Sequence, residues 1–260
     1  MKWCFLAAIL LATVAGRAAE MREIPALAAI FEKAGASGTF VMLDPKTGAL
    51  VGHDAARAAK RFIPASTFKI PNTLIGLETS AVKSVDEVLP YGGKPQMLPE
   101  WEKDMGLREA LPISAVPIYK ELARRVGLPR MREWLVKLDY GNCETGDKVD
   151  QFWLVGPLEI SAIEQVRFLA RLAAGDLPVD PENVAAVAAI TTLEKTPDAT
   201  LHAKTGWCMD AEPQIGWWVG WVERDGEAYP FALNMDMPEG IDPKVRLEIG
   251  RACLRELGVW

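Results

Sequence analysis

Histidine is scarce in this chain of 260 residues, which contains only His53 and His202. A Ser-His-Asp triad needs a histidine base beside its serine, and neither histidine has a spacing typical of zinc ligands. The Gly-x-Ser-x-Gly elbow of many serine hydrolases is also missing. We expect His53 to be a surface residue, His202 to have a structural or supporting role, and no metal site. A hydrolase with this sequence must therefore activate its nucleophile without histidine.

An excess of basic residues is lacking too. The 29 lysines and arginines are outnumbered by 35 acidic residues, and the formal net charge is −6. Phosphate binding requires clustered Lys and Arg, so a nucleic-acid partner is not favoured and none is expected. Internal repeats and low-complexity linkers are absent, and hydrophobic residues make up 50% of the chain. This composition is typical of one globular domain with a substantial core.

Long hydrophobic runs are absent except at the start of the sequence. Lys2 precedes an apolar run from Cys4 to Ala15, which at about a dozen residues is too short to span a bilayer. Small residues around Ala18 follow this run. We predict a signal peptide over residues 1–18 and a catalytic domain over 19–260, exported to the periplasm or secreted, without a stable membrane anchor.

Cysteine is also rare, and three of the four residues lie in the predicted mature chain: Cys143, Cys208 and Cys253. An odd number leaves at least one thiol without an internal partner. A Cys143–Cys208 disulfide is one possibility, because both residues follow motifs that we expect to meet at one cleft. Three free thiols are the alternative, and the sequence does not decide between them.

Patterning predicts strands at both ends of the chain and helices between them. We expect strands near 38–44, 49–53, 200–205, 216–222 and 230–235, with turns at 45–48 and 225–226. Helices are expected near 24–34, 66–79, 176–196 and 243–257, and the segment 107–174 should be mostly helical. The predicted fold class is therefore mixed α/β. An antiparallel sheet built from both termini is flanked by helices and carries an inserted all-helical subdomain.

Ser66 and Lys69 are three residues apart, so they share one face of the predicted helix. Apolar residues from Phe62 to Pro71 surround them, and a buried lysine loses part of its preference for the charged form. Such a lysine accepts a proton and can activate the serine. Ser80 and Lys83 have the same spacing, but their polar neighbours indicate a surface position.

Lys204-Thr205-Gly206 opens the strand-rich end of the chain and offers a cation and a hydroxyl to a cleft. Strand alternation places Lys204 and Gly206 on one face, and the glycine allows close approach to the backbone. His202 shares that face. The similar Lys46-Thr47-Gly48 follows Asp-Pro between two strands and indicates a turn instead.

Five motifs occur in an informative order. They are Ser66-Thr-Phe-Lys69, Ser114-Ala-Val116, Tyr140-Gly-Asn142, Phe152-Trp153-Leu154 and Lys204-Thr-Gly-Trp207. In content, order and approximate spacing the chain resembles the class D (OXA-type) serine β-lactamases, from Gly38 to the last helix. The resemblance implies an enzyme that hydrolyses the β-lactam amide bond of penicillin-type antibiotics, giving antibiotic resistance.

The resemblance assigns Ser66 as the nucleophile and Lys69, as N6-carboxylysine, as the general base. The carboxyl group comes from CO₂ or bicarbonate, and no other cofactor is implied. Trp153 matches the donor that holds the carbamate, and Ser114 relays a proton to the β-lactam nitrogen with help from Lys204. The residues implied to wall the site or contact the substrate are Val116, Thr205, Gly206, Trp207, Arg246, Leu154 and Trp101.

Alternatives remain at this stage. Arg251 competes with Arg246 as the arginine for the substrate carboxylate. A tethered sensor that acylates once, or a cell-wall transpeptidase or carboxypeptidase, would share the fold but keep its acyl-enzyme. The partner is a small-molecule β-lactam, and the protein is expected to be a monomer or a homodimer. The sequence does not reveal which β-lactams are preferred.

Overall fold

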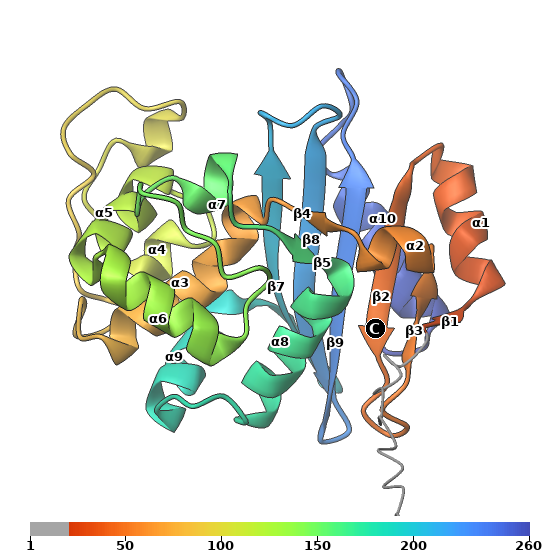
Figure 1. The fold of residues 1–260 in the computed structure, drawn as a ribbon. Helices are drawn as coiled ribbons and strands as arrows, with labels where there is room; N and C mark the ends of the chain where they lie inside the picture. The colour runs from red at the N-terminus through yellow and green to blue at the C-terminus, as the bar shows by residue number, and fades with distance from the viewer. Residues whose placement is uncertain (1–20) are drawn as a thin grey trace, which may run out of the picture.

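Residues 21–260 are described by a computed structural model, in which a seven-stranded sheet separates two groups of helices (Figure 1). The strand order is β1-β3-β2-β9-β8-β7-β6, so strands from the two ends of the chain meet where β2 pairs with β9. All neighbouring pairs are antiparallel except β1 with β3. The prediction of a sheet built from both termini is confirmed. The expected signal peptide lies outside the described residues.

The elements follow one another as strands, helices and strands again, as expected. The strands are β1 Arg22–Glu23, β2 Gly38–Leu43, β3 Leu50–His53, β4 Arg61–Phe62, β5 Ile160–Ser161, β6 Thr192–Lys195, β7 Ala199–Cys208, β8 Ile215–Arg224 and β9 Glu227–Asp236. The helices are α1 Pro25–Ala34, α2 Ala55–Ala59, η1 Ala65–Phe68, α3 Lys69–Glu78, η2 Pro99–Trp101, α4 Leu107–Ala110, α5 Val116–Val126, α6 Leu128–Leu138, α7 Phe152–Val155, α8 Ala162–Ala174, α9 Pro181–Thr191 and α10 Val245–Glu256. The strands β4 and β5 form a separate two-stranded sheet.

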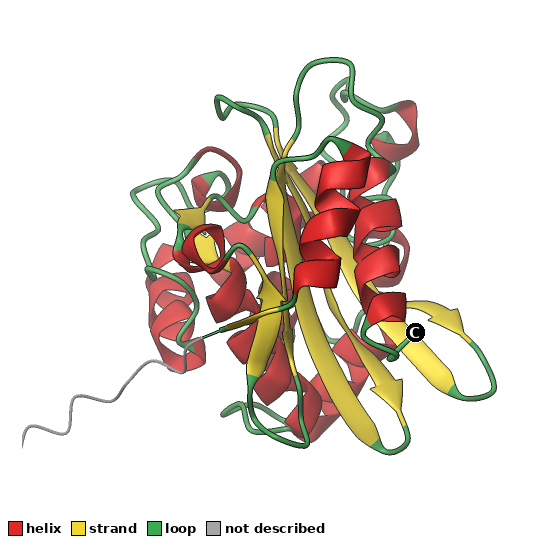
Figure 2. Cartoon of the chain, turned by 90° about the vertical axis from the view of Figure 1, so that its right-hand side faces the viewer, coloured by secondary structure: helices red, strands yellow, loops and turns green. Residues whose placement is uncertain are grey.

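Both faces of the large sheet are covered. Helices α1 and α10 pack on one face (Figure 2), and α8 packs on the other beside the inserted helical lobe of α3 to α6 and α9. Side chains of β8 alternate between the two apolar cores: Trp217 and Trp221 face α8, whereas Trp218 and Val222 face α10. A strand buried on both sides has no polar face, and β8 is accordingly almost wholly apolar.

Two turns have the predicted chemistry. Asp225 and Gly226 both have positive φ, 54° and 79°, and join β8 to β9 in a two-residue hairpin. Between β2 and β3, Thr47 donates a hydrogen bond of 2.8 Å to Asp44, and Gly48 has φ 68°. The Lys46-Thr47-Gly48 tripeptide is therefore a turn, as predicted.

Two boundaries differ from the prediction. The helix expected over 176–196 ends at Thr191, because the chain from Thr192 becomes strand β6 and pairs with β7. Consecutive threonines are β-branched and favour an extended chain once a partner strand is available. The helix expected to start at Ser66 begins with the tighter 3-10 turn η1, and α3 follows from Lys69.

Candidate active site

Ser66 lies in η1, where the helical lobe meets the sheet. The Lys69 side chain donates a hydrogen bond of 2.8 Å to the Ser66 hydroxyl, so the predicted pair does share one face. Ala65, just before the serine, has the left-handed φ of 48°, which is unfavourable for a residue with a Cβ. Thr67 stabilises this turn, because its hydroxyl donates to the Pro64 carbonyl and accepts from Gln165 at 2.9 Å.

Lys69 is buried, with 1% of its surface exposed. Burial, and next the nearby charge of Lys204, holds the pKa of Lys69 well below its usual value. The amine also lies 5.2 Å from the ring centre of Tyr119, a buried residue of α5. A neutral amine in an apolar site can act as a base or as a nucleophile.

Trp153 lies in helix α7 and packs beside the residue that precedes Lys69. Its indole packs on Phe68, the neighbour of Lys69, with ring centres 5.4 Å apart. The Trp153 side chain is fully buried, yet its indole N–H has no hydrogen-bond partner. An unpaired buried N–H costs about 1–3 kcal/mol, so this donor is suited to a group that the protein atoms alone do not supply.

Ser114 and Lys204 join the helical lobe to the sheet. The Lys204 ammonium donates a hydrogen bond to the Ser114 hydroxyl, and further bonds to the carbonyl and hydroxyl of Thr205 at 3.0 and 3.3 Å. Ser114 has the left-handed φ of 58° in the turn between α4 and α5. Strained backbone of this kind is concentrated at functional sites. Burial, and next the charge of Arg246, lowers the pKa of Lys204 to about 7.

Gly206 brings strand β7 close to the serine. A Cβ at this position would lie 2.9 Å from the Pro64 carbonyl oxygen and 3.1 Å from the Thr67 methyl. The β6 partner strand reaches β7 only as far as His202, so the next residues of β7 lie beside η1 without a strand partner on that side. The segment that contains Ser66 therefore lies close to the backbone of Gly206, whereas the approach of substrate there stays a prediction.

Arg246, in the first turn of α10, is buried beside Trp207. It is 8% exposed, its guanidinium lies 5.5 Å from the ring centre of Trp207, and its Nε and Nη1 atoms have no partner. Burial lowers its pKa to about 10. Arg251 instead pairs with Glu194 at 2.8 Å on the surface. Lys204 and Arg246 are thus two buried cationic groups, close enough for the charge of Arg246 to lower the pKa of Lys204.

The remaining expected residues differ in their placement. Val116 begins α5, and Leu154 is half-buried, with its carbonyl accepting a weak hydrogen bond from the Cys208 thiol at 3.7 Å. Trp101 is only 6% exposed and belongs to the apolar core of the helical lobe. Its indole donates at 2.9 Å to the carbonyl of Ile113, the residue before Ser114. Its expected place in the cleft wall stays a prediction.

Sequence reasoning did not single out Tyr119, whose ring lies below Lys69. Tyr119 is three residues after Val116, so helical spacing on α5 was the available signal. Ser80 is exposed beyond the end of α3, as predicted for a surface residue. His53 is half-buried rather than fully exposed and packs against Phe31.

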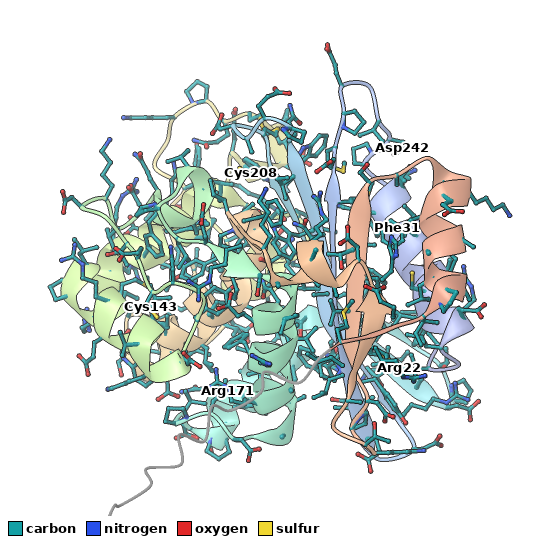
Figure 3. The ribbon with its side chains drawn as sticks, turned by 45° about the vertical axis from the view of Figure 1, so that its right-hand side comes forward. Arg22, Phe31, Cys143, Arg171, Cys208 and Asp242 are labelled. Carbon is teal, nitrogen blue, oxygen red and sulfur yellow. The ribbon has the colours of Figure 1, made fainter. Side chains whose placement is uncertain are left out.

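Cys143, Cys208 and Cys253 are free thiols, so the possible Cys143–Cys208 disulfide is not formed. Cys143 donates to the Leu135 carbonyl at the end of α6, whereas Cys208 lies near α7 (Figure 3). Each thiol is thus held by a different segment. Within residues 21–260, no three His, Cys, Asp or Glu side chains are grouped as ligands for a metal ion. No helix in that range is long and apolar enough to cross a membrane.

Comparison with known proteins identifies the arrangement. Residues 38–255 match the family described as the penicillin binding protein transpeptidase domain. The chain is 44% identical over 210 residues to the β-lactamase OXA-5 of Pseudomonas aeruginosa, covering 80% of this chain and 79% of the relative. It is 37% identical to OXA-48 of Klebsiella pneumoniae, covering 96% of both chains.

A solved structure has the same fold. The crystal structure of FUS-1 (OXA-85), a class D β-lactamase from Fusobacterium nucleatum subsp. polymorphum, superposes with a TM-score of 0.89 and 46% identity. The match covers 92% of this chain and 99% of that one. Sequence and structure comparisons thus point to the same group of enzymes.

Proposed function

This chain belongs to the class D β-lactamases, within the penicillin-binding transpeptidase family, and on that basis we propose a mechanism built on Ser66 and Lys69. The enzyme is a serine hydrolase that opens the β-lactam ring and so confers resistance to these antibiotics. The observation that carries our assignment is the buried Lys69 amine, which donates a hydrogen bond to Ser66 and directly follows Phe68, the residue on which the unpartnered indole of Trp153 packs.

Lys69 fits a carboxylated lysine. Its neutral amine attacks the carbon of CO₂, an N–C bond forms, one C=O electron pair moves to oxygen, and the amine releases a proton. The indole N–H of Trp153 is the donor for a carbamate oxygen, which accounts for the unpaired group there. When present, the carbamate supplies the general base that removes the proton first from Ser66 and later from a water.

Acylation then follows from the geometry. Deprotonated Ser66 attacks the lactam carbonyl, a C–O bond forms, and collapse of the tetrahedral centre breaks the C–N bond. Ser114 gives its proton to the leaving nitrogen and receives one from Lys204, whose ammonium already donates to it. The backbone N–H groups of Ser66 and Trp207 would stabilise the oxyanion.

Substrate binding uses the cationic end of the site. The carboxylate that penicillins carry is assigned to Lys204, Thr205 and Arg246, because Arg246 has two unpartnered donor atoms and the Lys204 ammonium lies beside the Thr205 hydroxyl. Arg251 is already paired with Glu194, which favours Arg246 for this role. Val116, Gly206 and Leu154 would form the walls, and Trp101 would support or line them.

The location and assembly are also proposals. We assign residues 19–260 to the mature enzyme, exported to the periplasm or secreted and acting without a stable membrane anchor. The mature protein would be a monomer or a homodimer. Its partner is a small-molecule β-lactam.

Turnover of a chromogenic cephalosporin tests the mechanism. The chain without residues 1–18 is assayed at substrate excess in CO₂-depleted buffer, with and without added bicarbonate. Sustained turnover that rises with bicarbonate supports a carboxylated Lys69. A single stoichiometric burst would contradict hydrolysis and indicate a sensor or a transpeptidase, and turnover unaffected by bicarbonate would contradict the proposed base.

A further inference from the structure

Trp153 lies within a long loop and packs on Phe68 of η1, the segment that contains Ser66. Residues 139–159 connect α6 to β5, and the only helix within them is the four-residue α7 that carries Trp153. The residue before α7, Gln151, makes no side-chain capping bond. A short helix of this kind has little stability of its own, so its position depends on how the loop is held.

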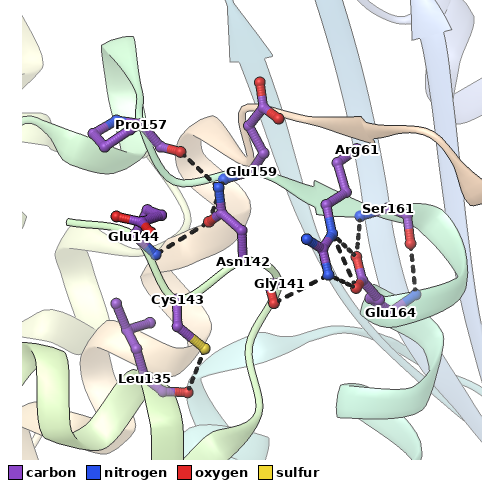
Figure 4. A network of polar contacts seen from close by, with 10 residues as sticks. All are labelled: Arg61, Leu135, Gly141, Asn142, Cys143, Glu144, Pro157, Glu159, Ser161 and Glu164. Carbon is purple, nitrogen blue, oxygen red and sulfur yellow. Dashed lines mark hydrogen bonds and ion pairs between the residues drawn. The ribbon is translucent and has the colours of Figure 1, made fainter. Parts of the chain in front are cut away.

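The Asn142 side chain joins the two ends of this loop (Figure 4). Its amide nitrogen donates to the Pro157 carbonyl at 2.9 Å, and its amide oxygen accepts from the backbone N–H of Glu159 at 3.0 Å. The same oxygen accepts from the N–H of Glu144 at 3.2 Å, and the Asn142 backbone N–H bonds to Glu159 at 3.0 Å. In this orientation both the nitrogen and the oxygen of the amide have backbone partners. Those partners lie at the two ends of the loop.

The neighbours of Asn142 place it for this contact. Gly141 has φ 59°, and a Cβ there would lie 2.2 Å from the Glu159 carbonyl oxygen, so only glycine lets the two ends meet. Tyr140 is fully buried and packs edge-on against Phe68. The Tyr140-Gly141-Asn142 motif therefore connects the base of the loop directly to the segment that carries Ser66 and Lys69.

We propose that Asn142 is a positioning residue that sets the affinity of Lys69 for CO₂, by fixing the loop that presents the Trp153 indole. Asn142 touches neither substrate nor the reacting atoms. Losing its amide would let the loop ends separate, move the indole N–H from its position, and leave the carbamate with a poorer donor. The inference rests on the proposed carboxylation of Lys69.

Two other contacts hold the middle of the loop, at Thr145 and Asp150. Arg124 pairs with Asp150 at 2.6 Å, and Arg132 donates to Thr145 at 2.9 Å. Neither contact joins the two loop ends, and Arg124 is half exposed. Asp150→Asn removes the charge but keeps an oxygen that can accept from Arg124, so it offers a control within the same loop.

The test is carbamate occupancy measured directly. Wild type, Asn142→Ala, Asn142→Asp and Asp150→Asn are titrated with ¹³C-bicarbonate, and the carbamate carbon signal is followed by NMR. We expect Asn142→Ala to raise the half-saturating bicarbonate concentration by about tenfold, since it loses three hydrogen bonds to the loop. Asn142→Asp keeps the accepting oxygens and should shift it less, while Asp150→Asn should match wild type.

The outcomes separate the two proposals. Absence of a carbamate signal in wild type would contradict carboxylation itself. A clear wild-type signal with unchanged half-saturation in Asn142→Ala would overturn the role of Asn142. If Asn142→Ala does not fold, Asn142→Asp decides: a shift that high bicarbonate overcomes supports the proposal, and none overturns it.

Discussion

Lys204 donates a hydrogen bond to Ser114, which lies 90 residues earlier in the chain and on the opposite side of the cleft. The contact joins β7 of the sheet to the turn that precedes α5. It places a proton donor next to a buried cation. This contact is the basis of the proposed relay, in which Lys204 supplies the proton that Ser114 delivers.

Removal of the Ser114 hydroxyl should slow acylation selectively. Ser114→Ala leaves the leaving nitrogen without its immediate donor, and loss of such a group costs about 10²–10⁴-fold. Stopped-flow measurement of the first turnover should show that loss in the acylation rate, with deacylation nearly unchanged. Equal slowing of both steps would argue against a role in nitrogen protonation.

Trp153→Phe tests the unpartnered indole. The substitution keeps an aromatic ring on Phe68 but removes the buried N–H. We expect weaker carbamate formation, a stronger requirement for bicarbonate, and acyl-enzyme that accumulates and is visible by mass spectrometry. Trp221→Phe, which removes an indole N–H bonded to Glu223 elsewhere, serves as the control and should behave like wild type.

Arg246→Ala should weaken recognition of the substrate carboxylate. Hydrogen bonds to charged groups contribute about 1.5–3 kcal/mol, so kcat/KM should fall by about 10–100-fold. Arg251→Ala, a surface change at the same helix, should leave kcat/KM within about twofold of wild type. A substrate methyl ester should be hydrolysed equally by wild type and Arg246→Ala; a persistent difference would mean that Arg246 acts elsewhere.

The charge of Lys204 should depend on carboxylation of Lys69. With the free Lys69 amine, burial and the neighbouring Arg246 lower the pKa of Lys204 to about 7, so the cation is lost as pH rises through 7. A negative carbamate on Lys69 favours the charged form and raises the pKa of Lys204. The ¹³Cε signal of Lys204 should therefore titrate at higher pH with saturating bicarbonate, and the alkaline limb of kcat/KM should lie above 7. Identical titrations in both buffers would contradict a negative charge at Lys69.

The sequence was sufficient for the parts of the fold that depend on local chemistry. Glycines in hairpins, alternation along strands and the spacing of Ser66 and Lys69 each predict a local geometry. The structure has the predicted turns and the predicted contact between Ser66 and Lys69. The boundary at Thr191 was missed because the extended chain after it is stabilised by a partner strand. The conformational preferences of neighbouring residues do not reveal a partner strand elsewhere in the chain.

The parts of the site that depend on contacts between distant segments could not be predicted from the sequence. Arg246 and Arg251 lie on the same helix, and only the packing of α10 against Trp207 distinguishes the buried guanidinium from the surface ion pair. Asn142 was recognised as part of a motif, but its hydrogen-bond partners Pro157 and Glu159 are 15 and 17 residues away in the sequence. Sequence spacing alone does not reveal such contacts. The disulfide question was likewise geometric, since it depends on the placement of α6 relative to α7.

The pairing of β2 with β9 also constrains how the chain can acquire its structure. Gly38 pairs with Met235, so the centre of the sheet joins segments near opposite ends of the sequence. Contacts this distant in sequence form slowly, because a long loop must close before they stabilise anything. During synthesis the nascent chain therefore lacks its central sheet until β9 has emerged, and a chain truncated before β9 would have exposed strand edges prone to aggregation.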